Sequence, residues 1–359
     1  MIYHCITRVV ERRLAFGPEE KEQFRTYLRM YENFSGCRVL SYCLMGNHVH
    51  LLLEVPPMPA EGLSDAELLR RLRAIYNAPA VALVAKELAE VRQQVKVGLV
   101  DESLVREIHG RYTYRMHGLG EFMKTLLARY TRWFNTKHER TGALWESRFK
   151  SVLVEDGIAA RTMAAYIDLN PLRAGLVADP AEYRWCSYGE AMGGGPRGDG
   201  RKARAGLVRA LMAHKMKAPN HKRDIRNEEV AGLWKEVSKD YRMLLLVGGD
   251  EKLREVRGAD GRLAVKVVRR GMRKEVVAAE LARLERGRDV ALGKMLRCRV
   301  RYFTDGAVIG SRAFVDEVFA RCRERFGERR KSGPRKLRGS GAAAAGMLWS
   351  VRDLRKGIG

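Results

Sequence analysis

The stretch Met45–Val55 reads MGNHVHLLLEV and organises the first half of the chain. Gly46-Asn47 is a turn signal between two apolar runs, so the pattern predicts a β-hairpin whose second strand begins at His48. Side chains alternate between the two faces of a strand, so we expect His48 and His50 on one face. Two neighbouring neutral imidazoles can ligate one divalent cation. Two histidines that only form hydrogen bonds within a strand are the other interpretation.

Hydrophobic periodicity and turn residues extend this hairpin into a longer series of elements. The expected elements are a strand at 2–10, a helix at 17–33, strands at 38–45 and 48–55, a helix at 119–135, a strand at 149–154 and a helix at 158–169. This order favours an α+β fold of the ferredoxin-like, split βαβ type, with an antiparallel sheet and helices on one face. Residues 58–118 read as a charged helical insertion.

The net charge of +25 is concentrated in the second half of the chain. Residues 1–200 carry a net charge of +3 and residues 201–359 a net charge of +22. We therefore expect a first domain at 1–190, a glycine-rich linker at 191–206 and a basic, mainly helical C-terminal domain at 207–359. A basic surface of this strength is typical of nucleic-acid binding, although an ordinary solvated basic surface is an alternative.

The cysteines and the hydropathy pattern bear on the compartment. The six cysteines form no CxxC pair and no zinc-type spacing, which favours reduced, mostly buried thiols. The sequence shows no secretion signal and no apolar run long enough to span a bilayer. We expect a cytoplasmic protein without a membrane partner.

A second candidate motif is AYIDLNP, residues 165–171. Tyr166 and Asn170 are four residues apart, so on a helix they share one face. Beside two imidazoles, the Asn170 oxygen would complete a three-ligand divalent site, and the Tyr166 hydroxyl would be a candidate nucleophile. A core tyrosine and a C-capping asparagine are the alternative, because Pro171 disfavours helical dihedrals at Asn170.

Taken together, these motifs resemble a known family. HVHLL resembles the histidine–apolar–histidine motif of single-tyrosine HUH endonucleases. YIDLNPLRAGLV, WESRFKS at 145–151 and EYRWCSY at 182–188 resemble the REP-associated tyrosine transposases. The resemblance covers residues 1–190 and implies a ferredoxin-like core. The insertion and the basic C-terminal part lie outside the minimal family pattern.

The resemblance implies a role for each matching residue. His48, His50 and Asn170 would hold the metal, which would be Mg²⁺ or Mn²⁺, and Tyr166 would be the nucleophile. The implied activity is cleavage and rejoining of single-stranded DNA near hairpin-forming palindromes, through a 5′-phosphotyrosine intermediate. The expected partner is single-stranded or hairpin DNA, and a homodimer is one option for assembly. Tyr130 is a weaker nucleophile candidate, because Phe134 follows it where a ligand would be needed.

Basic and aromatic residues border the proposed site. Arg148, Lys150 and Arg173 are expected to contact DNA phosphates, and Trp145, like Trp185, could stack on unpaired bases. The alternatives are core tryptophans and arginines paired with neighbouring carboxylates. Two other functions stay open. One is a non-catalytic regulator that binds DNA hairpins on an inactive transposase core, and the other is a hydrolytic metallonuclease in which the tyrosine is structural.

Overall fold

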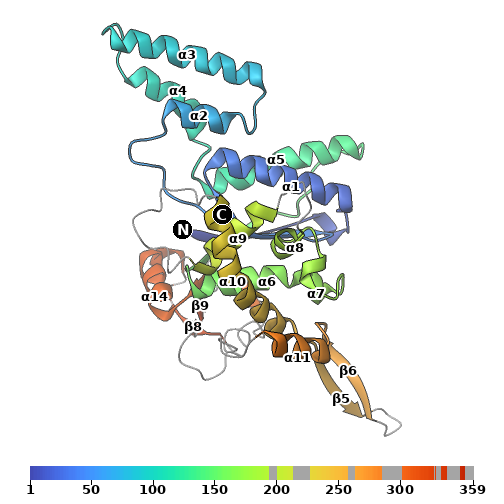
Figure 1. Cartoon of the computed structure of the whole chain (residues 1–359). Helices are drawn as coiled ribbons and strands as arrows, with labels where there is room; N and C mark the ends of the chain where they lie inside the picture. Colours follow the sequence, from blue (N-terminus) through green and yellow to red (C-terminus); the bar gives the residue numbers. More distant parts are fainter. Residues whose placement is uncertain are drawn as a thin grey trace. The chain divides into compact units, whose positions relative to one another are not determined.

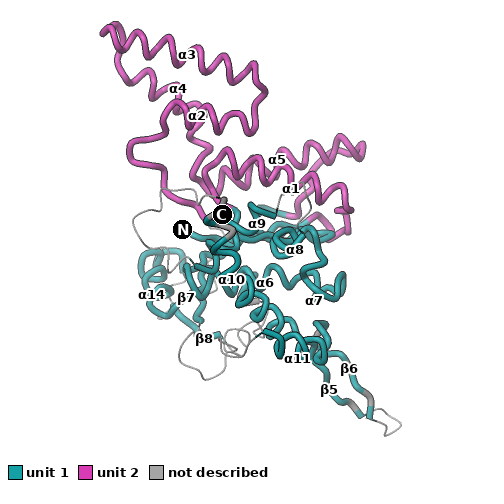
Figure 2. Tube along the Cα trace, in the orientation of Figure 1, with its two compact units in different colours: residues 1–8, 39–53, 147–359 teal, residues 9–38, 54–146 magenta. Residues whose placement is uncertain are grey.

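The computed structural model describes most of the chain and divides it into two compact units (Figure 2). The described residues are 1–193, 200–212, 227–257, 263–284, 301–326, 328, 333–337 and 348–351. Unit 1 comprises residues 1–8, 39–53 and 147–359, and unit 2 comprises residues 9–38 and 54–146. No helix in the described ranges combines the length and the apolar character needed to cross a membrane.

Within the described residues, a mainly antiparallel sheet of seven strands forms the centre of unit 1 (Figure 1). Its order is β2-β3-β1-β4-β7-β9-β8. The strands are β1 (Ile2–Arg8), β2 (Arg38–Leu44), β3 (His48–Glu54), β4 (Lys150–Val154), β7 (Val308–Gly310), β8 (Arg335–Lys336) and β9 (Trp349–Val351). The first four strands have the order of the split βαβ plan, so the expected α+β fold with a mainly antiparallel sheet is confirmed.

Strand β1 has a central place in this sheet. It pairs with β4 in antiparallel register, with Ile2 opposite Val154 and His4 opposite Val152. Ile2 and both valines are buried in the same hydrophobic cluster. Because side chains alternate along a strand, His4 lies on the face of β1 that faces this core.

One face of the sheet is covered by α6 (Ile158–Asp168), a helix buried along almost its whole length. Gly157, with φ of 75°, turns the chain into the helix. The alanines at 159, 160, 164 and 165 favour the helix and let neighbouring elements approach closely. The helices α8 (Ser187–Met192), α9 (Gly200–Met212) and α10 (Asn227–Gly249) also contribute buried side chains to this core.

Described segments beyond residue 200 also pack into this same core. A Cβ at Gly206 of α9 would lie 2.2 Å from the Val39 carbonyl oxygen, so α9 needs glycine there to sit against β2. The compact units therefore do not follow the boundaries expected from the sequence. The expected linker lies partly outside the described residues, and the assignment of 207–359 to nucleic-acid binding stays a prediction.

The C-terminal part contains more strands than its sequence suggests. It contains the helices α11 (Lys274–Arg283), α13 (Arg301–Thr304) and α14 (Arg312–Arg321). It also contains the strands β7, β8 and β9 of the main sheet and a separate hairpin of β5 (Lys252–Arg257) and β6 (Leu263–Arg269). Strand β7 extends the main sheet in parallel with β4. Strands of two or three residues, such as β7, β8 and β9, are too short to show a recognisable alternation of apolar and polar side chains in the sequence.

In unit 2, α1 (Pro18–Ser35) and α5 (Leu119–Lys137) pack against each other around an aromatic cluster. Tyr130 lies in this cluster with Phe16, Phe24 and Trp145. Its hydroxyl donates to the Glu20 carbonyl oxygen at 3.1 Å, and burial raises the pKa of this phenol. Tyr130 is therefore a core residue.

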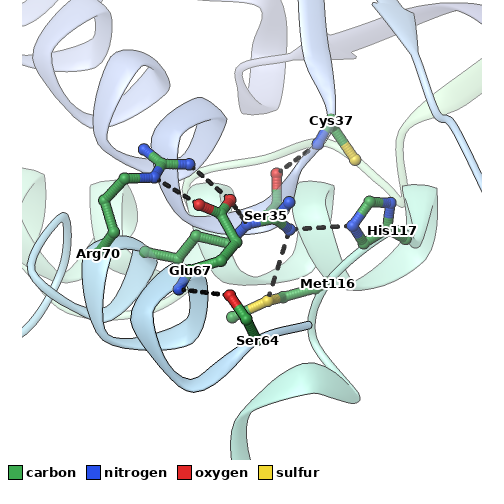
Figure 3. A network of polar contacts seen from close by, with 8 residues as sticks. Ser35, Cys37, Ser64, Glu67, Arg70, Met116 and His117 are labelled. Carbon is green, nitrogen blue, oxygen red and sulfur yellow. Dashed lines mark hydrogen bonds and ion pairs between the residues drawn. The ribbon is translucent and has the colours of Figure 1, made fainter. Parts of the chain in front are cut away.

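Residues 58–118 of unit 2 contain the helices α2 (Asp65–Leu72), α3 (Ala78–Lys96) and α4 (Ser103–Thr113), and the interpretation of this segment as an insertion stays a prediction. A polar network holds its base (Figure 3). Arg71 donates to Glu67 at 2.7 Å and to Nε2 of His117 at 2.9 Å. Nδ1 of His117 in turn lies 3.1 Å from the Pro56 carbonyl oxygen. The network joins the first helix of the insertion to the segments that enter and leave it.

A buried carboxyl group ties α6 to the helices around it. Asp168 is fully buried, accepts a hydrogen bond from the Tyr241 hydroxyl at 2.6 Å and accepts another from the Tyr188 amide at 3.0 Å. Burial raises the pKa of the Asp168 carboxyl to about 7, against the lowering effect of these hydrogen bonds.

We predict that Asp168→Asn reduces the pH dependence of stability. The folded-state pKa of Asp168 lies above its ordinary value. Its stabilising contribution to the free energy of unfolding is therefore fully present below about pH 4 and is lost as the pH rises through about 7. The amide keeps an acceptor and does not ionise. Urea unfolding at pH 5 and pH 8 should show the wild type losing on the order of 2 kcal/mol or more relative to the variant. If the free energy of unfolding changed equally in both proteins between pH 5 and pH 8, the raised pKa of Asp168 would be contradicted.

Candidate functional site

Strand β3 presents its two histidines side by side. The ring centroids of His48 and His50 are 5.0 Å apart, with the planes at 80°. Leu52, two residues further on, is buried in the core beneath α6. The structure therefore places both imidazoles on the face of the sheet that also carries α6.

A third histidine, His4 of β1, joins this pair. Its ring lies nearly parallel to that of His50, with centroids 5.2 Å apart and planes at 12°. Nε2 of His4 lies 3.0 Å from Nδ1 of His50, and Nδ1 of His4 lies 2.8 Å from the Phe303 carbonyl oxygen. His4 stands in no motif of the sequence that marks it as a site residue. Its position in an alternating strand was visible, but its pairing with His50 depends on strand order.

Helix α6 brings Tyr166 to the histidines. The Tyr166 ring centroid is 5.9 Å from that of His50 and 6.0 Å from that of His4, both in edge-on geometry. The Phe303 ring stacks on the Tyr166 ring, with centroids 4.5 Å apart and planes at 13°. The Arg173 guanidinium carbon lies 5.4 Å from the Tyr166 ring centroid. The structure thus brings together the tyrosine and both histidines that the sequence motifs single out.

The Tyr166 side chain is closed off from solvent. Its exposed fraction is 2%, and burial raises the pKa of its phenol to about 12. Arg173 and Arg8 lower this pKa but do not outweigh burial. The phenol is therefore protonated at neutral pH and is a weak nucleophile in this state.

Asn170 begins α7 (Asn170–Ala174), directly after α6. Its side-chain amide nitrogen donates to the carbonyl oxygens of Tyr166 and Ile167, at 3.0 and 3.2 Å. These contacts are those of a residue that satisfies the free carbonyls at a helix end. The capping role left open by the sequence is thus observed, and metal ligation by Asn170 stays a prediction.

The histidines are held in their neutral form. Burial lowers the pKa of His4 and of His48 to about 4, and lowers the pKa of His50 well below its ordinary value. The positive charge of Arg8 adds to this effect at His48 and His50. Neutral imidazoles are the form that binds a cation.

A divalent cation bound by His48 and His50 would need further ligands besides these two ring nitrogens. In the described part of the chain, no group of three or more His, Cys, Asp or Glu side chains is arranged to hold a metal. A cation at His48 and His50 would therefore depend on a donor outside these residue types, such as the Asn170 amide oxygen, or on water or phosphate.

Of the residues expected to bind DNA, Lys150 has the clearest place. It is exposed and lies opposite Ile6 in the β1–β4 register, which puts it on the face that carries His4. Arg8, at the end of β1, lies on the same face by alternation and acts electrostatically on His48, His50 and Tyr166. No motif in the sequence distinguishes Arg8 from the other arginines.

The other residues expected at the DNA surface differ in their surroundings. Arg148 is exposed and lies over the Phe149 ring. Trp145 belongs to unit 2, where it packs among aromatic residues, and its indole nitrogen lies 3.4 Å from the Leu127 carbonyl oxygen. Trp185 is partly buried against the core of unit 1. The contacts of both tryptophans favour the core alternative, and their stacking on DNA bases stays a prediction.

We predict that Phe303→Ala lowers the pKa of Tyr166. Burial is the largest cause of the raised value, and the Phe303 ring covers one face of the phenol. Selective ¹³Cζ-tyrosine NMR should show the Tyr166 signal beginning to titrate at lower pH in the variant than in the wild type. Phe319→Ala, in a separate hydrophobic cluster of unit 1, is the control and should leave the Tyr166 signal unchanged. An unaltered titration in Phe303→Ala would show that other groups bury the phenol.

The N-terminal segment of the chain is similar to a known family. Residues 1–61 match the family model described as IS200-like transposase. A search of the curated proteins found no match. A solved structure of a REP-associated tyrosine transposase bound to a REP hairpin aligns with a TM-score of 0.32 and 9% identity, over 53% of this chain and 78% of that chain. The resemblance read from the sequence motifs is thus confirmed for the segment that carries His4, His48 and His50, which is similar to IS200-like transposases.

Proposed function

We propose that the chain is a metal-dependent transposase or endonuclease that cleaves and rejoins single-stranded DNA near hairpin-forming palindromes. The observation that carries the proposal is the convergence of Tyr166, from α6, on the paired imidazoles of β3. A phenol beside two neutral imidazoles is a combination suited to covalent phosphoryl transfer assisted by a cation. The match of residues 1–61 to IS200-like transposases supports the same chemistry.

In this proposal His48, His50 and Asn170 hold Mg²⁺ or Mn²⁺. When bound, such a cation polarises the scissile phosphate and neutralises the charge that develops on it. The Tyr166 oxygen attacks phosphorus as its phenolic proton is lost. A phosphotyrosine bond forms to the 5′ end, and the broken P–O bond leaves a 3′-hydroxyl after proton uptake. Attack by a 3′-hydroxyl on the phosphotyrosine reverses the exchange and rejoins the strand without ATP.

The positive side chains near Tyr166 would oppose the rise in the pKa of its phenol that burial causes. Arg8 and Arg173 both lower the pKa of the phenol. They would also attract the phosphate that approaches it, because guanidinium groups pair well with phosphate oxygens. A DNA strand can reach Tyr166 only after the ring is uncovered, so productive binding requires displacement of groups such as Phe303.

A non-catalytic regulator that binds DNA hairpins is the second candidate. The observation in its favour is the closed state of Tyr166, with 2% exposure and a raised phenol pKa. The net charge of +22 on residues 201–359 suits binding with or without cleavage.

We predict that Tyr166→Phe abolishes a covalent protein–DNA adduct formed with labelled hairpin DNA and Mn²⁺. Denaturing gels measure the adduct, and native gels run in parallel measure binding. Tyr183→Phe is the matched control, because its buried hydroxyl donates to the Leu44 carbonyl oxygen at 2.7 Å outside the ring cluster. It should retain the adduct.

The other outcomes of this experiment separate the remaining functions. Cleavage by the wild type without an adduct would indicate a hydrolytic nuclease. A mobility shift with neither adduct nor cleavage would leave the regulator. An adduct that persists in Tyr166→Phe would assign the nucleophile to another residue.

We predict that Arg8→Gln weakens single-stranded DNA binding and reduces its dependence on salt. Each phosphate contact that is lost lowers the slope of log K against log salt by about 0.7 for single strands. Fluorescence anisotropy between 50 and 200 mM salt measures the slope. Arg106→Gln removes the same charge from an exposed site on α4, where the side chain is 71% exposed, and serves as control. Equal slopes in Arg8→Gln and wild type would exclude a phosphate contact at Arg8.

A further inference from the structure

A chain of hydrogen bonds runs from the backbone of α13 through His4 to His50. The Phe303 carbonyl oxygen can only accept, so Nδ1 of His4, at 2.8 Å, carries the hydrogen. His4 is fully buried, and its hydrogen bonds in the described structure go to this carbonyl group and to His50. A neutral imidazole has one ring hydrogen, so Nε2 of His4 is an acceptor.

This assignment fixes the state of the next ring. Nδ1 of His50 lies 3.0 Å from Nε2 of His4 and must be the donor of that hydrogen bond. Nε2 of His50 is then left with its lone pair. The Phe303 carbonyl group therefore sets the direction of both hydrogen bonds, the one it accepts from His4 and the one from His50 to His4.

The neighbouring histidine is held in the same way. Nδ1 of His48 lies 2.6 Å from Oδ1 of Asn47, and with the amide oxygen as acceptor, Nε2 of His48 also keeps its lone pair. Two different partners thus select the same tautomer in both histidines of the pair. Histidines that ligate a metal through one ring nitrogen usually donate a hydrogen bond from the N–H group of the other.

We propose that His4 is a positioning residue, which holds His50 in the tautomer and orientation that offers Nε2 to a divalent cation. The inference rests on the proposed function for the identity of the ligand. His4 is not itself a ligand, because both of its ring nitrogens are engaged, one by Phe303 and the other by His50. The role belongs to His4 and to the backbone of residue 303, which lies in the C-terminal half of the chain.

Tautomers can be measured directly in the metal-free, full-length protein. Long-range ¹H–¹⁵N correlation spectra of ¹⁵N-histidine-labelled protein distinguish Nδ1–H from Nε2–H rings. We expect His4, His48 and His50 all as Nδ1–H. In His4→Phe, which removes the acceptor, we expect His50 to lose this single state. In His4→Gln, the side-chain oxygen can still accept from His50, so the Nδ1–H form should be retained in part.

Mn²⁺ affinity, measured by titration calorimetry, is the second readout. We expect His4→Phe to bind Mn²⁺ about 10- to 100-fold more weakly than wild type, as is typical when a supporting hydrogen bond to a metal ligand is removed. His4→Gln should recover part of the loss. His48→Ala should abolish binding. His117→Gln is the control for loss of a partly buried histidine, since His117 lies in unit 2, and it should bind Mn²⁺ like wild type.

The two readouts separate the inference from the function on which it rests. A wild type that binds no Mn²⁺ would overturn the metal-dependent function, and the spectra would still report the hydrogen-bond chain. An Nε2–H tautomer at His50 in wild type would overturn the positioning role, as would wild-type Mn²⁺ affinity in His4→Phe. If His4→Phe does not fold, as judged by circular dichroism, the spectra of wild type and His4→Gln decide the matter.

Discussion

The site depends on the place of β1 between β3 and β4 in the sheet. Only this order sets His4 beside His50, and only the alternation of both strands turns these rings toward α6. The same register places Lys150 and Arg8 on that face, at the end of β1 where the core gives way to charged residues. One strand thus supports the imidazoles and also contributes positive charge next to them.

Burial acts on the two kinds of side chain in opposite ways. It disfavours charge, so it lowers the pKa of the three histidines and keeps them neutral, in the form that binds a cation. It raises the pKa of Tyr166 for the same reason and keeps the phenol protonated. The imidazoles are therefore neutral while the phenol of the candidate nucleophile is protonated. Chemistry on Tyr166 would need an added positive charge or an opening of the ring cluster.

The sequence predicted the parts of the fold that repeat a simple pattern. The strands at β1 to β4 and the helices at α1, α5 and α6 follow from alternation, helical periodicity and turn residues, to within two residues at their ends. The pairing of His48 and His50 on one face also follows from local geometry. Their meeting with Tyr166 was inferred from a family resemblance, since nothing local relates β3 to α6.

What the sequence did not reveal depends on contacts between distant residues. His4 and Phe303 are separated by 299 positions, and their hydrogen bond has no signature in either segment. The short strands β7 to β9 have too few residues for a periodic pattern, and the buried surface of α9 was obscured by its basic composition. Asn170 showed both of its possible roles in the sequence, and only the structure revealed the hydrogen bonds at the end of α6.

The parallel pairing of β4 with β7 has a consequence for how the protein is made. Leu153 pairs with Val308, so the first four strands leave the ribosome long before their neighbour exists. Until then β4 is an open edge, and such edges readily recruit strands from other chains. Closing a loop of this length is slow compared with local folding. Nascent chains would pass through a stage in which the edge of β4 is unpaired, and translation speed or chaperones would then influence the yield of folded protein.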